Sequence, residues 1–149
     1  SGHSLEQYTI HAGKSIPNIW SIGGFSLSEN TAYACEPFVT TEQGGGFVRN
    51  GKIKNIFAIN SRKKTKNEEA DKLLNFIWEN FNMLPFALRW ITKEWEEKKA
   101  RELLDILIKK KAVQAYPVLI EVNEQRVAQA EHTFIPTESG VTVTTKALA

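Results

Sequence analysis

The chain has few of the residues that stabilise small secreted proteins or span membranes. It has a single cysteine in 149 residues, which excludes an internal disulfide and favours a reducing compartment. No apolar run reaches the length needed to cross a bilayer, and no basic and apolar leader is recognisable near Ser1. These absences predict a cytoplasmic protein without a membrane partner.

The chain also has few aspartates and only a small excess of positive over negative charge. Asp71 and Asp105 are the only aspartates, and both lie in helix-like stretches. Nineteen basic residues oppose seventeen acidic ones, which gives a net charge of +2. A balance this close does not by itself indicate a nucleic-acid partner, and none is expected.

The composition does fit a folded domain with a core. Hydrophobic residues make up 42% of the chain, and its length fits one domain or one domain with an insert. Residues 1–60 and 122–149 have the patterns of β-strands, and residues 61–121 have helical periodicity. Asn50-Gly51 predicts a hairpin turn, because a type I′ turn needs positive φ at both central residues. Two C-terminal stretches, 127–135 and 141–145, are predicted to pair through the turn-forming residues 136–140.

The helical part is predicted to hold three helices. The first begins after the N-cap candidate Asn67, the second lies near residues 85–91, and the third covers about 93–111. A short extended piece, 118–122, follows them, so the order resembles a winged-helix layout. The apolar stripes that we expect to be buried are Leu73, Leu74, Ile77 and Phe81 on the first helix and Leu103, Leu104, Leu107 and Ile108 on the third.

Four short stretches hold the residues most suited to chemistry. In chain order they are Gly2-His3-Ser4, Ile10-His11-Ala12-Gly13-Lys14, Ala34-Cys35-Glu36-Pro37-Phe38 and Ala130-Glu131-His132-Thr133. Imidazole and carboxylate both bind divalent first-row ions, and two such ions can activate water at neutral pH. The same residues are also explained by exposed glutamates and hydrogen-bonded histidines, which are commoner than metal ligands. Ligand types alone leave both interpretations open.

The order of these motifs resembles the type II methionine aminopeptidases, in their archaeal form. Two further segments share the resemblance: Asn80 to Trp90, which ends in Arg89-Trp90, and Ala115-Tyr116-Pro117. The likeness covers nearly the whole chain and includes the helical insert between the two glutamate motifs. It implies an α+β fold, namely the C-terminal half of the pita-bread (creatinase/aminopeptidase) fold, with residues 61–121 as a winged-helix-like insert.

The resemblance also implies an activity, which is metal-dependent removal of the initiator methionine from nascent proteins. The enzyme would be a hydrolase and metalloprotease that uses two divalent ions, Co, Mn, Fe or Zn. His3, Glu36 and Glu131 match the family's metal ligands, and Glu36 also matches a proposed proton shuttle. His11 matches a histidine that contacts the substrate. Phe38 and Tyr116 match residues near the methionine pocket.

One departure from the family limits these expectations. The family also uses two aspartate ligands and another histidine, and neither Asp71 nor Asp105 matches them. The expected partners are therefore the N-terminal half of the same enzyme and the N-terminal Met of nascent peptides, with proximity to the ribosome as a further expectation. The chain by itself is expected to be inactive, and its first residue is expected to lie in the middle of a natural protein.

Two alternatives remain beside this one. Some pita-bread relatives have lost metal chemistry and act as ribosome- or RNA-associated binding proteins, which the basic runs of the insert would suit. The presence of both histidines and both glutamates argues against that class. A proline-specific peptidase of the same fold is disfavoured by the insert between the glutamate motifs.

Overall fold

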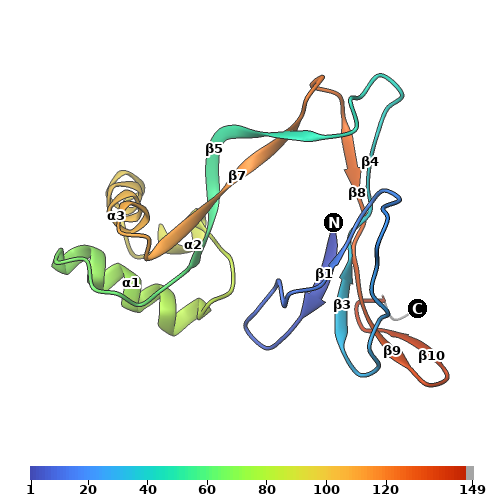
Figure 1. Cartoon of the computed structure of the whole chain (residues 1–149). Coiled ribbons are helices and arrows are strands. Elements are labelled where there is room, and N and C mark those ends of the chain that lie inside the picture. The colour runs from blue at the N-terminus through green and yellow to red at the C-terminus, as the bar shows by residue number, and fades with distance from the viewer. Residues whose placement is uncertain (147–149) are drawn as a thin grey trace. The chain divides into compact units, whose positions relative to one another are not determined.

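The computed structural model describes residues 1–146, and these divide into two compact units. The first unit comprises residues 1–48 and those from 121 onward, and the second comprises residues 49–120. Strands make up the first unit, whereas the second contains all three helices of the described residues (Figure 1). The second unit therefore includes most of strand β5 (Val48–Ile59), which precedes the helical residues.

A five-stranded sheet dominates the first unit. Its strand order is β10-β9-β3-β1-β2, and every neighbouring pair is antiparallel. The strands are β1 (Gly2–Leu5), β2 (Ser15–Ile16), β3 (Ala32–Cys35), β9 (His132–Thr137) and β10 (Gly140–Val143). A separate two-stranded ladder joins β4 (Phe38–Thr40) to β8 (Val127–Gln129). The pairing of β9 with β10 confirms the predicted C-terminal hairpin in part. Its turn is shorter than the predicted 136–140, and residues 127–129 of the predicted first strand form β8 and pair with β4 instead.

The second unit packs its helices against a three-stranded sheet of order β6-β5-β7. The flanking strands are β6 (Phe86–Ala87) and β7 (Val113–Glu121). The helices are α1 (Glu68–Phe81), α2 (Leu88–Ile91) and α3 (Glu97–Lys109). Within the described residues, no helix is long and apolar enough to cross a membrane.

The core of this unit lies where the sequence predicted it. Leu73, Leu74 and Ile77 of α1 are buried, and Phe81 at its end stacks on Phe86 with ring centroids 5.4 Å apart. The fully or almost fully buried residues of α3 are Ala100, Leu103, Leu104 and Leu107. The amphipathic stripes of both helices are therefore confirmed as core, except that Phe81 and Ile108 are only partly buried against it.

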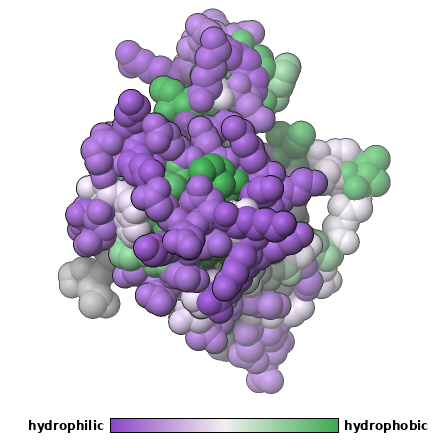
Figure 2. Space-filling model, turned by 90° about the vertical axis from the view of Figure 1, so that its left-hand side faces the viewer, coloured by the Kyte–Doolittle hydropathy of each residue, from purple (hydrophilic) through white to green (hydrophobic). Residues whose placement is uncertain are grey.

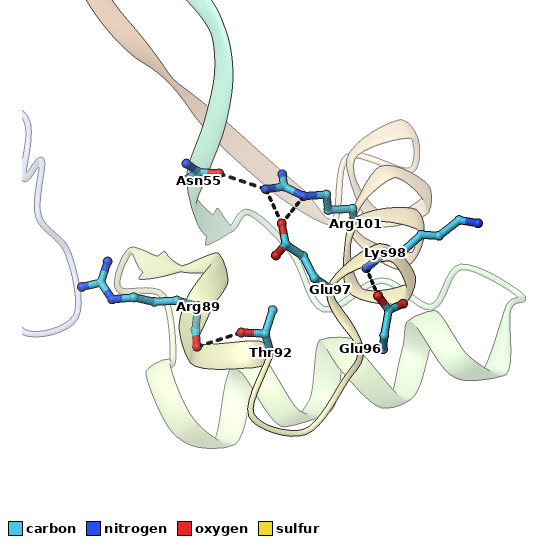
Figure 3. Close-up of polar contacts among 7 residues, drawn as sticks. All are labelled: Asn55, Arg89, Thr92, Glu96, Glu97, Lys98 and Arg101. Carbon is cyan, nitrogen blue, oxygen red and sulfur yellow. Dashed lines mark hydrogen bonds and ion pairs between the residues drawn. The ribbon is translucent and has the colours of Figure 1, made fainter.

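Side-chain contacts at its start explain why α3 begins later than the predicted residue 93. Glu96 caps the helix, since its carboxylate accepts hydrogen bonds from the backbone N–H groups of Lys98 and Lys99 at 3.0 and 3.1 Å. Arg101 then ties the helix to the sheet, because its guanidinium bonds both Glu97 of the same helix and Asn55 of β5 (Figure 3). The predicted second helix is likewise shorter than 85–91, because residues 86 and 87 pair with β5 instead.

The hairpin predicted at Asn50-Gly51 is wrong. Both residues lie inside the continuous strand β5, and neither has positive φ. Gly51 is instead explained by close packing. A Cβ atom there would lie 2.8 Å from the carbonyl oxygen of Val118 on β7, so a larger residue would push the two strands apart.

A buried carboxylate fixes the two loops at one end of the first unit. Glu121 is 3% exposed and accepts hydrogen bonds from the backbone N–H groups of Gly45, Asn123 and Gln125. Burial raises its pKa, but the backbone hydrogen bonds outweigh that effect and hold the pKa below the usual 4.5.

Glu121→Gln should therefore lower the melting temperature at pH 7. A carboxyl whose pKa is depressed in the folded state contributes stability above its unfolded pKa of 4.5. That contribution is lost as the pH falls through the lower folded value, so the difference between wild type and variant should shrink on acidification. Circular dichroism melts over a series of pH values measure it. The exposed Glu42 is the control position, and an equal loss in Glu42→Gln would contradict the prediction.

Candidate metal centre

The sheet of the first unit brings His3 and Glu36 into contact. His3 lies opposite Ala34 in the β1–β3 ladder, and Glu36 follows Ala34 by two residues. Opposite residues and alternate residues share one face of a sheet, so both side chains are on the same face. His3 Nε2 lies 2.8 Å from Glu36 Oε1, and the two side chains are only 11% and 17% exposed.

Close approach of the two strands makes this contact possible. A Cβ atom on Gly2 would lie 2.3 Å from the carbonyl oxygen of Ala34, a distance that real structures do not tolerate. Glycine at position 2 therefore lets β1 lie tightly against β3 just beside His3. Gly2→Ala would force the strands apart and move the imidazole away from Glu36.

The loop after β1 returns His11 to the same place. The backbone N–H of Ala12 donates to the carbonyl of Ser4 at 2.9 Å, and that of Lys14 donates to the Ser4 hydroxyl at 3.1 Å. These bonds hold the His11 ring beside His3, with ring centroids 4.2 Å apart. Partial burial of the ring, and then the neighbouring His3, lower the pKa of His11, while Glu36 opposes them. The lowered pKa favours the neutral imidazole, which has one hydrogen to donate.

Glu131 is placed opposite Glu36 by the strand register. Cys35 pairs with His132 in the β3–β9 ladder, and Phe38 pairs with Gln129 in the β4–β8 ladder. The two ladders continue each other in the same register. Glu36 and Glu131 lie between the paired residues of the two ladders, so they are opposite each other. The backbone N–H of Ala130, which bonds the carbonyl of Pro37 at 3.3 Å, holds the two chains together there.

The register places the positions of Glu36 and Glu131, and so two negative charges, opposite each other. Like charges directly across a sheet are destabilising unless something neutralises them. The atoms of His3 and Glu36 that contact each other are also the lone-pair donors that a divalent ion would use. Within residues 1–146, however, no group of three or more His, Cys, Asp or Glu side chains is close enough to hold an ion. The structure thus joins two of the three predicted ligands, while the exposed side chain of Glu131 is not part of a group with them.

The remaining predicted residues lie further along the chain. Phe38 begins β4 and is 40% exposed. Tyr116 lies on β7 in the second unit, where its hydroxyl lies 2.6 Å from Gln114 Nε2. Its assignment to the methionine pocket therefore stays a prediction.

Sequence reasoning overlooked the residues that brace this centre. Ser4 is 3% exposed and fixes Lys14 through its hydroxyl, and the Lys14 ammonium bonds the Ser28 hydroxyl at 2.9 Å. Ser4 and Lys14 both belong to the four short stretches named in the sequence analysis. The signal that could have identified Ser4 was a small polar residue in the middle of a buried strand.

Comparison with known proteins finds similarity to archaeal methionine aminopeptidases. The chain is 38% identical over 146 residues to a methionine aminopeptidase of Methanocaldococcus jannaschii, covering 98% of this chain and 48% of that protein. It is also 38% identical over 150 residues to the methionine aminopeptidase of Saccharolobus solfataricus, and this match covers 99% of this chain and 49% of that protein. The chain thus spans about half the length of these curated relatives, in agreement with the predicted C-terminal half. No protein-family model matches it.

The fold is shared with a solved structure as well. The structure of a thermophilic Arx1 superposes on this chain with a TM-score of 0.77 and 17% sequence identity. The superposition covers 95% of this chain and 38% of the Arx1 chain. At this identity the likeness concerns the fold, which is the pita-bread α+β fold that the resemblance implied.

Proposed function

Because this chain is a homologue of the archaeal methionine aminopeptidases, we propose that it supplies part of a metal-dependent aminopeptidase centre. The contact between His3 Nε2 and Glu36 Oε1, at 2.8 Å on a nearly buried sheet face, is the observation that supports this most. The proposed reaction is hydrolysis of the peptide bond after an N-terminal methionine. A relative without metal chemistry would have no need of this pair, or of a second carboxylate opposite it.

His3, Glu36 and Glu131 are the residues that would hold two divalent ions. Such ions lower the pKa of bound water and stabilise developing negative charge. Co, Mn, Fe and Zn all accept imidazole and carboxylate, so the donors do not select among them. Before binding, His3 and Glu36 hold each other in place, which reduces the ordering that metal binding requires.

The other residues would act on the substrate. His11 would donate a hydrogen bond to the scissile carbonyl as negative charge develops on its oxygen, because its lowered pKa keeps it neutral. Glu36 would also transfer a proton to the leaving amine. Phe38 and Tyr116 would contact the methionine side chain, whose flexible thioether suits an apolar pocket. The substrates would be nascent proteins in the cytosol, which fits the single cysteine.

The proposal implies that this chain does not act alone. Two contacting ligands cannot enclose two ions, and the relatives are about twice as long. The remaining ligands would come from the part of the enzyme that this chain does not span. We expect purified chain to show no turnover of a Met-Ala-Ser peptide with added Co or Mn. Clear turnover would contradict the inference that this chain holds only part of the metal site.

A fused enzyme tests the function itself. In it, this chain replaces the matching segment of the Methanocaldococcus jannaschii relative, so that the missing ligands are restored. The fused enzyme should release methionine from the peptide, and Ala-Ala-Ser should not be cleaved. A folded fused enzyme that loads metal and yet is inactive would refute the proposal.

A further inference from the structure

The near-neutral charge of the whole chain conceals two units of opposite charge. Residues 49–120 carry sixteen basic and nine acidic side chains, for a net charge of +7. The remainder carries three basic and eight acidic side chains, for a net charge of −5. The total of +2 therefore does not disfavour a nucleic-acid partner for the second unit.

Folding concentrates this charge at one place in the second unit. The backbone N–H groups of Asn60 and Ser61 both donate to the carbonyl of Ala112, at 2.8 and 3.1 Å. These bonds bring the lysine-rich segment 62–66 beside the lysines at 109–111. Between the segments is a hollow of about 240 Å³, called here the basic hollow, which is lined by Lys63, Lys64, Thr65, Lys66 and Lys110.

Neighbours of the lysines in this region are held in place, whereas the lysines themselves are exposed and not neutralised. Thr65 is buried, and both its backbone N–H and its hydroxyl donate to Asp71 Oδ1 at 2.8 Å. The Arg62 guanidinium lies over the Trp78 ring, 4.7 Å from its centroid. Lys109 and Lys111 flank Lys110, and all the lysines of the two segments are exposed. None of them forms an ion pair with another residue in the described part of the chain.

The surroundings favour a phosphate backbone over a membrane. Binding in a bilayer interface needs an exposed apolar face beside the basic residues. No large exposed hydrophobic residue occurs in 60–81 or in 97–117, and the apolar stripes of α1 and α3 are buried in the core. Figure 2 views the molecule from the side of these helices, and its surface there is mostly hydrophilic. Lysines serve as point charges for phosphates and read no sequence.

We propose that the basic hollow, together with Lys109 and Lys111, binds the phosphate backbone of a structured nucleic acid. The surface lies within the second unit, so it does not depend on the metal centre. Binding should be insensitive to sequence and strongly dependent on salt, because each neutralised phosphate releases counterions.

The test measures binding by fluorescence anisotropy of labelled RNA and DNA duplexes. Each duplex has roughly 16–20 base pairs, which is the length that a typical duplex-binding module covers. Salt is varied from about 50 to 200 mM. The plot of log K against log salt should fall with a slope of about −0.9 for each phosphate contacted. In the full chain carrying K63Q, K64Q and K110Q, the slope should become shallower by roughly 2–3, and affinity at low salt should fall about tenfold or more.

A matched control removes the same charge elsewhere in the unit. The variant K52Q, K93Q and K98Q also replaces three exposed lysines of the second unit, and it should keep most of the affinity. A second hollow variant, K109Q with K111Q, gives an independent measurement if the first is unstable in a thermal melt.

The two duplexes show whether RNA or DNA is the source of the phosphates, and tight binding to either supports the proposal. Equal losses in the hollow and control variants would overturn it, since general attraction would then explain the affinity. Salt-independent binding would overturn it too. So would equally tight, lysine-dependent binding to vesicles of phosphatidylserine and phosphatidylcholine.

Discussion

His11→Ala in the fused enzyme should lower kcat by about 10²–10³-fold and leave the bound metal unchanged. The magnitude is that of removing one donor to a developing oxyanion. The ring lies against His3, with centroids 4.2 Å apart, yet makes no contact with the Glu36 carboxylate among the hydrogen bonds and ion pairs of the described residues. The proposal assigns His11 to the substrate and His3 to the metal, although the two rings lie side by side. Steady-state kinetics on the Met-Ala-Ser peptide and metal analysis of the same preparation measure both quantities.

Two other variants separate this role from metal binding. Glu131→Gln should lose metal together with activity, because the charge of a proposed metal ligand is removed. His132→Ala should change little, since His132 follows Glu131 on the opposite sheet face and bonds Thr145 at 3.0 Å. If His11→Ala emptied the site while His3→Ala kept its metal, the roles assigned to the two histidines would be reversed.

Leu104→Ala should destabilise the second unit by about 2–5 kcal/mol, as truncation of a buried leucine does. Leu104 is 1% exposed and lies in the core formed by α1, α3 and the sheet. The lost methyl groups leave a cavity that the close-packed helices can fill only in part. Urea unfolding monitored by tryptophan fluorescence suits the test, because Trp78, Trp90 and Trp95 all belong to this unit.

Leu119→Ala is the matched control for this change. Leu119 lies in β7 of the same unit but is 57% exposed, so its truncation should cost less than about 1 kcal/mol. Equal destabilisation by both substitutions would mean that the core does not depend on the α3 stripe.

Local pattern was sufficient for the buried faces of the two long helices and for the chemistry of the motifs. A helix repeats its face every 3.6 residues, so Leu73, Leu74 and Ile77 identified the buried face of α1 without tertiary information. The histidines and glutamates were equally visible, because ligand chemistry belongs to single side chains. The order of their motifs also resembled that of the archaeal methionine aminopeptidases, to about half of whose length the chain is similar.

Contacts between distant segments required the tertiary structure. Asn50-Gly51 has the composition of a turn, but β7, more than sixty residues later in sequence, pairs with it as a strand and makes Gly51 a site of close packing. The contact of His3 with Glu36 likewise depends on strand register, which a short sequence window does not determine. The division of charge between the units has the same origin, because a total of +2 carries no information about which lysines fold together. Residue types and periods are local properties, whereas register, close approach and charge clustering arise only when remote parts of the chain meet.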